Sequence, residues 1–290
     1  MGKLGRVGLT LLVVAAAVIA GAWVWDQYLY SPWTRDGRIR ADVITIAPDV
    51  SGWVTDVSVK NNQLVSKGAP LFTIDDTRYR AKFAENNARL AQARTGWDLA
   101  KHQYERRQRM AESRSISEES LEAYRIRAET AKASYQLAEA ELNTARIDLE
   151  RTEVLAPKNG IVNNLSLRQG NFASRGTAVL SLIKSDSFYV TGYFEETKLH
   201  LVRVGQKARI TLLSGGKKLS GEVTSIARGI ADSNTSSDSQ MLPQVQQAFN
   251  WVRLAQRIPV DITLDPLPEG VNISAGMTVS IYLEADPESD

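Results

Sequence analysis

Hydrophobic and polar positions follow distinct patterns along the chain, and each pattern predicts a different kind of element. Residues 7–25 carry no charge and are almost wholly apolar. Residues 47–75 and 156–184 alternate with a period of two between Gly, Asn and Pro, which predicts short strands and tight turns. Residues 77–152 lie between these stretches and repeat every seven residues, and residues 186–285 alternate again.

The stretches 47–75 and 156–184 are related to each other. Each begins with Ala-Pro, continues through a Gly before a short apolar pair, and turns at a basic residue followed by Gly. One such unit is too small to bury both faces of its strands alone. We therefore expect segments 43–75 and 153–185 to close on one another as one small β-sandwich, which is similar to a biotinyl/lipoyl-type domain split into two half-motifs.

A lipoyl or biotinyl carrier subunit is one alternative for the function. The carrier version of that domain bears its modified lysine in the hairpin that joins the two halves. Here the long segment 77–152 occupies that position, so carriage of biotin or lipoate is disfavoured and no cofactor is expected.

Residues 77–152 predict an antiparallel α-helical coiled-coil hairpin. They contain no Pro and one Gly, and helix-favouring residues dominate. Apolar residues at a sustained spacing of three and four mark a seam between two helices. The seam positions are Phe83, Leu90, Ala93, Trp97, Ala100 and Tyr104 in the first arm, and Leu121, Tyr124, Ala128, Ala131, Tyr135, Ala138, Leu142, Ala145 and Leu149 in the second.

The seven-residue pattern breaks once, at residues 113–117, which predicts a single turn between two arms of similar length. Ser115 followed by Glu118 fits a capping box, and Ser117 is an alternative N-cap of the second arm. Both ends of the hairpin meet the half-motifs, so we expect the sandwich to hold its base. A dimerisation coiled coil is the alternative, which the central break disfavours.

The uncharged run 7–25 predicts a membrane anchor, with residues 1–30 as a cytoplasmic tip and transmembrane helix. A helix of this length spans roughly 28 Å, close to the thickness of the hydrocarbon core. The expected anchor residues include Leu9, Leu12, Val18, Trp23 and Trp25. A cleaved signal peptide ending at residues 20–22 is the alternative. The flanking charges favour a cytoplasmic N-terminus and an exported bulk.

The C-terminal third, residues 186–285, predicts a small antiparallel β-barrel, because its apolar positions alternate between turn residues. Residues 231–257 interrupt it as a polar loop or insertion, and residues 286–290 form a tail.

Composition excludes several classes of chemistry. The chain has 35 basic and 33 acidic residues, which disfavours a nucleic-acid binder that depends on a large basic excess. It has no cysteine, and its two histidines, His102 and His200, lie far apart in the sequence, so neither a thiol site nor a His-rich metal site is expected. We find no Walker A sequence, and we expect no enzymatic activity.

The order of these elements resembles the periplasmic adaptor proteins, or membrane fusion proteins, of the HlyD family. Segments 31–52, 188–199 and 251–262 are similar to adaptors of p-hydroxybenzoate efflux pumps. The resemblance implies an elongated α+β multidomain protein without catalytic residues. It also implies a single-pass protein of the Gram-negative inner membrane with its bulk in the periplasm, which serves the export of aromatic carboxylic acids such as p-hydroxybenzoate.

The resemblance further implies partners and a docking site. The expected partners are a FUSC-type inner-membrane exporter, a TolC-like outer-membrane channel, and further copies of the chain in a trimer or hexamer. Adaptors that dock on TolC-like channels carry the motif Arg-x3-Leu-x6-Ser at the hairpin tip, where x is any residue. Arg106, Met110 and Ser117 stand at that spacing, and methionine keeps an unbranched apolar side chain in place of leucine.

An Emr-type multidrug adaptor, working with a major-facilitator antiporter, is the nearest alternative. Such adaptors share the apolar-Pro-Val segment seen at residues 258–260. The sequence leaves this alternative open.

Overall fold

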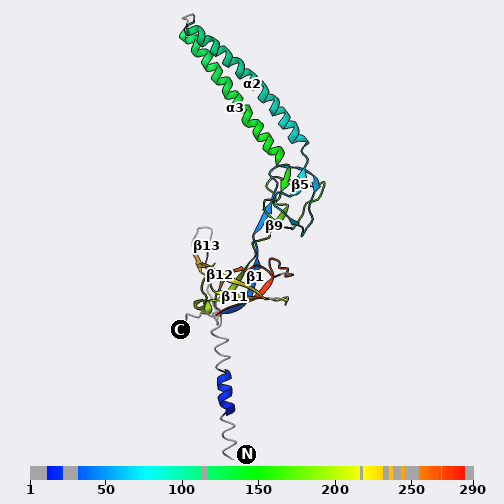
Figure 1. Cartoon of the computed structure of the whole chain (residues 1–290), viewed down its shortest axis with the longest axis vertical. Coiled ribbons are helices and arrows are strands. Elements are labelled where there is room, and N and C mark those ends of the chain that lie inside the picture. Colours follow the sequence, from blue (N-terminus) through cyan, green and yellow to red (C-terminus); the bar gives the residue numbers. More distant parts are fainter. Residues whose placement is uncertain are drawn as a thin grey trace, which may run out of the picture. The chain divides into compact units, whose positions relative to one another are not determined.

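A computed structural model describes residues 12–21, 32–112, 116–215, 218–230, 235–237, 243–245, 255–268 and 270–284. The chain divides into two compact units (Figure 1). One unit combines residues 1–42 with 186–290, and the other comprises residues 43–185.

The first unit is built around a closed antiparallel barrel with the strand order β1-β10-β15-β12-β11-β16. These strands are β1 (Trp33–Arg40), β10 (Tyr189–Glu195), β11 (Lys207–Leu212), β12 (Leu219–Ile226), β15 (Arg257–Leu264) and β16 (Thr278–Leu283). The barrel confirms the fold predicted for the C-terminal third. Its core includes Ile39, Phe194 and Ile262, which are completely buried.

Strand β1 completes this barrel, although the sequence pattern did not indicate it. It pairs antiparallel with β10 on one side and with β16 on the other. Its sequence, WTRDGRIR, carries four charged residues, and the apolar alternation is correspondingly faint. Gly37 of β1 lies opposite Gly192 of β10. A Cβ on either glycine would come within 2.7 Å of the Ile281 side chain, so the strands pack closely there.

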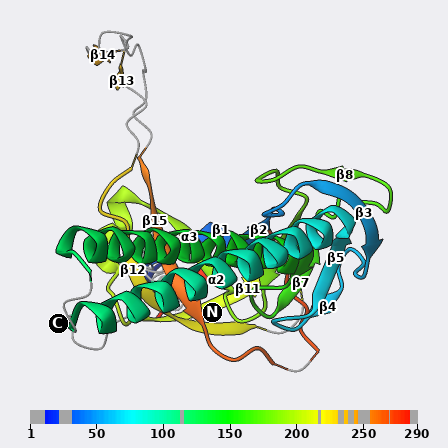
Figure 2. The same cartoon turned by 90° about the horizontal axis from the view of Figure 1, so that it is seen from above.

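Two short elements complete the described part of this unit. The 3-10 helix η1 (Glu196–Leu201) follows β10. Strands β13 (Thr235–Ser237) and β14 (Pro243–Val245) pair antiparallel within the segment predicted to be a loop or insertion (Figure 2).

The second unit contains a sandwich of two four-stranded sheets, with the orders β2-β9-β7-β4 and β6-β5-β3-β8. The strands from the first half-motif are β2 (Val43–Ile46), β3 (Gly52–Val57), β4 (Leu64–Val65) and β5 (Pro70–Ile74). Those from the second are β6 (Glu153–Leu155), β7 (Gly160–Asn163), β8 (Phe172–Ala173) and β9 (Leu180–Lys184). Each sheet takes two strands from each half-motif, which confirms that the halves close on one another.

Reciprocal hydrogen bonds explain why Ala-Pro and basic-Gly recur in both copies. The amide of Gly68 donates to the carbonyl of Ala156 at 2.8 Å, and the amide of Gly176 donates to the carbonyl of Pro48 at 2.9 Å. Gly68 and Gly176 have φ angles of 82° and 75°, a conformation that glycine adopts without strain. The turn of each half-motif is therefore tied to the Ala-Pro of the other.

One expected strand is absent from the sandwich. The alternation at residues 165–167 predicts a strand, but these residues lie outside the strands of the structure. Asn164 has a φ angle of 51°, which turns the chain just before them. Leu167 is nevertheless buried at 4% exposure, so the apolar pattern reflected burial without a strand.

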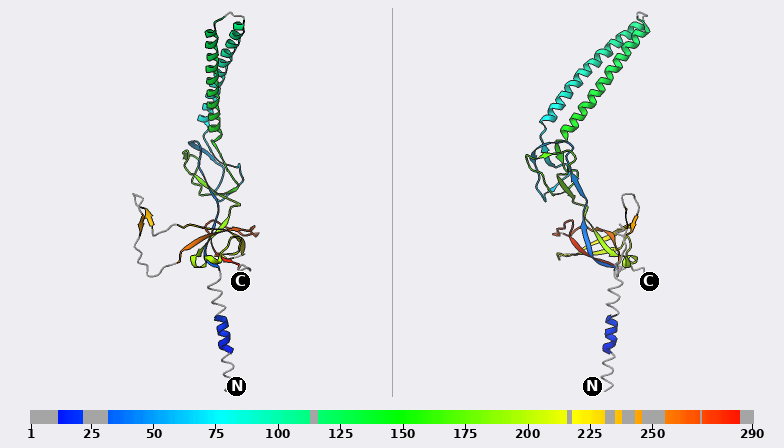
Figure 3. Two further views of the ribbon diagram at one scale, coloured as in Figure 1. Left: turned by 90° about the vertical axis from the view of Figure 1, so that its left-hand side faces the viewer. Right: turned by 180° about the vertical axis from the view of Figure 1, so that it is seen from behind.

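The helical hairpin consists of α2 (Thr77–Glu112) and α3 (Glu118–Glu150), which lie side by side (Figure 3). The hairpin prediction is confirmed, and every predicted seam residue is buried or half-buried. Trp97 stacks on Tyr135 across the seam with ring centroids 5.1 Å apart. Asn86, which the heptad pattern did not indicate, is also buried, and its side-chain amide donates to the Glu141 carbonyl at 3.0 Å.

Residues 12–21 are helical. Among the residues that the structure describes, no helix is both long and apolar enough to cross a membrane. Leu12 and Val18 of the predicted anchor lie in this helix and are exposed. The other predicted anchor residues, Leu9, Trp23 and Trp25, lie outside the described residues.

Candidate functional site

The tip of the hairpin is the first candidate site. On the C-terminal side of the tip, α3 begins with a capped first turn. Ser117 is the N-cap of α3, and its hydroxyl accepts a hydrogen bond from the Ser120 amide at 3.3 Å. Glu118 and Glu119 occupy the first turn, where negative charge is favourable. Of the two capping alternatives, the Ser117 cap is therefore formed, whereas Ser115 lies outside the described residues.

Arg106 and Met110 lie one turn apart on α2, so their side chains project from the same face of the helix. Both are exposed, as is Ser117 at the start of α3. The three predicted docking residues therefore present a cation, a flexible apolar side chain and a hydroxyl at the surface, two from α2 and one at the start of α3.

Ser117 can be tested separately as a cap and as a docking residue. We expect Ser117→Ala to lose about 1 kcal/mol of local stability, because the first turn of α3 loses its cap. Hydrogen exchange of residues 118–122 should then be faster. Ser117→Asn should preserve the cap without adding charge and keep exchange as slow as in the unchanged chain, so a loss of channel binding in this variant would assign the hydroxyl to docking. Unchanged exchange in Ser117→Ala would contradict the capping role.

Near the tip, one tyrosine of α3 packs against two arginines, one of which comes from α2. The Arg107 guanidinium lies 4.9 Å from the centre of the Tyr124 ring and donates to its hydroxyl at 3.4 Å. Arg127 lies 5.3 Å from the same ring centre. The heptad pattern indicates Tyr124 as a seam residue but indicates neither arginine. The only signal is the i,i+3 spacing of Tyr124 and Arg127, which places them on one face.

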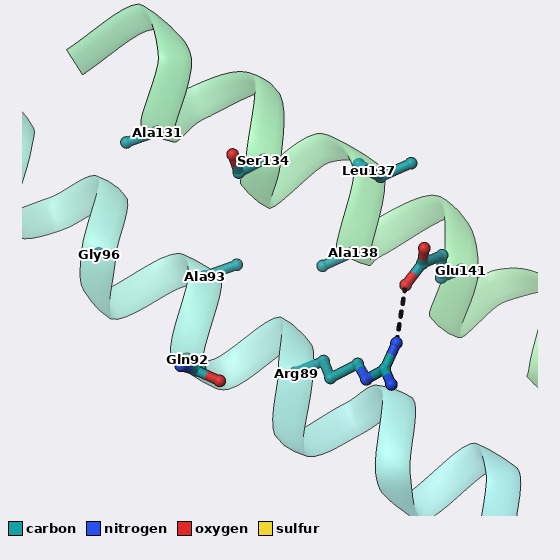
Figure 4. Close-up of a pocket in the computed structure, with 9 residues that line it drawn as sticks. All are labelled: Arg89, Gln92, Ala93, Gly96, Ala131, Ser134, Leu137, Ala138 and Glu141. Carbon is teal, nitrogen blue, oxygen red and sulfur yellow. Dashed lines mark ion pairs between the residues drawn. The ribbon is translucent and has the colours of Figure 1, made fainter. Parts of the chain in front are cut away.

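A groove of about 520 Å³ lies farther along the hairpin between α2 and α3 (Figure 4). Small residues leave it open, and a Cβ added at Gly96 would meet no atom within 4 Å. At one end Arg89 pairs with Glu141 at 3.9 Å. The groove lining is formed by Arg89, Gln92, Ala93, Gly96, Ala131, Ser134, Leu137, Ala138 and Glu141. The lining is made of small, polar and apolar residues, and its two charged side chains, Arg89 and Glu141, pair with each other.

The base of the hairpin bears on the carrier alternative. Strand β5 leads into α2 within three residues, and the Asp75 carboxylate accepts a hydrogen bond from the Thr77 amide at 2.9 Å. Hydrogen bonds from Thr77 lower the pKa of Asp75 below its ordinary value. On the return, α3 leads into β6, which pairs with β5. The helical hairpin thus stands where a carrier domain would present its lysine.

The barrel carries a second candidate site, which the sequence pattern does not indicate. A cleft of about 680 Å³ is lined by residues of β1, β10, η1 and β15. Residues from three distant segments of the chain meet there, so no local motif signals it.

Comparisons with known proteins agree with these domains. Residues 42–184 match the barrel-sandwich hybrid domain of RND membrane fusion proteins, and residues 187–284 match the AAEA-like β-barrel domain. The chain is 45% identical to the uncharacterized protein YdhJ of Escherichia coli K12 over 273 residues, which cover 94% of this chain and 95% of YdhJ.

Solved structures of low sequence identity share the fold. The membrane fusion protein Spr0693 of Streptococcus pneumoniae R6 has a TM-score of 0.62 at 17% identity, covering 87% of this chain and 98% of that chain. A MacA-MexA chimera with the Pseudomonas aeruginosa MexA α-hairpin domain has a TM-score of 0.62 at 20% identity, covering 88% and 83%. With its split sandwich, inserted hairpin and matching barrel, the chain belongs to the family of membrane fusion proteins.

Proposed function

We propose that this membrane fusion protein is the periplasmic adaptor subunit of a tripartite efflux pump, linking an inner-membrane transporter to an outer-membrane channel. The observation that carries the proposal is the hairpin of α2 and α3, which leaves and re-enters the sandwich through the paired strands β5 and β6. Helices of 36 and 33 residues reach about 54 and 50 Å, a length suited to bridging separate proteins.

The adaptor acts without catalytic chemistry, and the energy for export comes from its transporter. The apolar run 7–25 supports a single-pass anchor in the inner membrane, with the N-terminus in the cytoplasm and the bulk in the periplasm. One hairpin cannot enclose a path, so several copies, as a trimer or hexamer, form the conduit.

The hairpin tip docks on a TolC-like channel through Arg106, Met110 and Ser117. Their exposure and their position on both sides of the turn support this role. Arg106 would pair with a carboxylate or carbonyl of the channel, and Met110 would fill an irregular apolar gap.

The cargo is an aromatic carboxylic acid such as p-hydroxybenzoate, and the transporter is a FUSC-type exporter. The AAEA-like match of the barrel and the similarity of segments 31–52, 188–199 and 251–262 support this choice. An Emr-type adaptor remains the second candidate, because β15 contains the Ile258-Pro259-Val260 segment.

Co-purification in mild detergent tests the partner. We expect the full-length chain, tagged at its C-terminus, to retain a FUSC-type exporter identified by mass spectrometry. Retention of a major-facilitator antiporter would favour the Emr-type alternative. Recovery of the chain without any transporter, under conditions in which it stays folded and oligomeric, would contradict the adaptor proposal.

A further inference from the structure

The cleft on the barrel gathers cationic side chains around one tryptophan. Trp33 lies on β1, and the Arg35 guanidinium carbon is 5.2 Å from its ring centre. The ammonium of Lys198, which comes from η1, is 5.1 Å from the same centre. Because the protein's own cations lie over the indole, this ring favours anchoring positive charge over stacking an aromatic ligand.

A β-bulge holds these groups in place. The pairing of β1 with β16 shifts register between Thr34 and Gly37. Thr34 is buried, and its hydroxyl donates to the Tyr193 carbonyl at 2.8 Å and accepts from the Asp36 amide at 3.1 Å. Bulges of this kind redirect side chains out of the regular alternation. The backbone of β1 therefore fixes where Arg35 and Asp36 point.

A third cation completes the cleft. Arg257 of β15 donates to the Asp36 carboxylate, so the bulge also holds this guanidinium in place. The charged residues of the lining are Arg35, Lys198 and Arg257 against Asp36 and Glu195, and His200 lies beside them. The lining is therefore net positive, and its cations come from three separate elements.

We infer that this cleft binds the phosphate headgroups of anionic phospholipids, so that the barrel itself contacts the membrane surface. The inference rests on the proposed anchor. Trp33 follows the end of the apolar run at Trp25 by eight residues, a distance of at most about 29 Å even in a fully extended chain. An inserted anchor therefore keeps the cleft near the headgroups, where tryptophan and cationic side chains are favoured.

Lipid binding by the full-length chain tests this inference. The probe is dioctanoyl phosphatidylglycerol added to the chain in uncharged detergent, with dioctanoyl phosphatidylcholine as the zwitterionic comparison and native mass spectrometry as the readout. We expect at least about tenfold preference for phosphatidylglycerol, weakening as salt rises. The double variant Arg35→Gln, Lys198→Gln should lose most of this preference.

The matched control removes two cations of the same barrel outside the cleft. Lys207 and Arg209 pair with Glu222 and Glu284 on the barrel surface. Lys207→Gln, Arg209→Gln should keep the preference for phosphatidylglycerol. An unchanged preference in the cleft variant, with the barrel folded by hydrogen exchange, would overturn the inference.

Competition distinguishes a lipid headgroup from a soluble anion. Inorganic phosphate and p-hydroxybenzoate should compete poorly at millimolar concentration, and effective competition by either would reassign the cleft and overturn the lipid assignment. The measurement needs no transporter, so its failure leaves the adaptor role standing. Failure of transporter co-purification would reject that role without changing the lipid result.

Discussion

Removal of residues 100–125 should abolish export while the sandwich and the barrel stay folded. The deletion shortens α2 by residues 100–112 and α3 by residues 118–125. The hairpin then loses its tip, with roughly 20 Å removed from α2 and roughly 12 Å from α3. The Trp97–Tyr135 stack lies within the helices that remain and should hold the shortened pair together. The measurement is efflux of p-hydroxybenzoate from cells that lack the native gene, with the intact chain as reference.

Two controls distinguish a loss of docking from misfolding of the shortened chain. Hydrogen exchange in β7 and β15 should match that of the intact chain, and the transporter should still co-purify. Normal export by the shortened chain would reject a role for hairpin length and for the tip.

A pair of arginine variants narrows the same test to single side chains. Arg106→Ala should lower export several-fold, because the proposed contact with the channel loses its cation. Arg109→Ala removes another exposed arginine of α2, one turn away, and should have little effect. Equal losses in both variants would indicate a general charge effect and contradict the proposed motif.

Gly160→Ala should destabilise the sandwich by about 2–3 kcal/mol, because a well-packed core yields little to an added group. A Cβ at Gly160 would lie 2.5 Å from the carbonyl oxygen of Ile183 and 2.9 Å from the Leu182 side chain. The carbonyl belongs to β9, which pairs directly with β7, so the strands would have to separate. Urea unfolding of the full chain, followed by hydrogen exchange in β7 and β9, measures the effect.

Gly52, the counterpart in the first half-motif, provides a graded comparison. A Cβ there would lie 2.6 Å from the Ile74 Cγ2 methyl, a side-chain atom that can move more easily than a backbone carbonyl. Gly52→Ala should therefore lose less stability than Gly160→Ala. The opposite order would show that the tight backbone approach at Gly160 is not what limits the strand pairing.

The repeated glycines show why much of the fold could be predicted from the sequence. Gly52 and Gly160 recur because each strand approaches a neighbour closely, and the heptads recur because both helices share one seam. Strand β1 escaped detection because its charged residues serve a bulge and a cleft, which obscures the period of two. Asn86 escaped because a buried amide whose NH2 group donates to a carbonyl across the seam has no signature in its own helix.

The two candidate sites also differ in how far they could be predicted from the sequence. The spacing of Arg106, Met110 and Ser117 can be read within one short segment, and the structure has Arg106 and Met110 in the last two turns of α2 and Ser117 just before α3. The cleft around Trp33 depends on residues from β1, η1 and β15, which only the closed barrel brings together. The cleft also depends on the register shift in β1, which is a feature of backbone pairing and not of a local sequence motif.

The pairing of β5 with β6 has a consequence for how this protein can diverge. Phe72 lies opposite Val154, so the two ends of the inserted helices are held at a separation set by one strand pair. Whole heptads can therefore be gained or lost in equal numbers on both helices of the hairpin without disturbing the sandwich. Descendants of such a chain could adjust to envelopes of different depth by changing the length of the hairpin alone, and grafting a foreign hairpin between Ile74 and Glu153 should yield a folded hybrid.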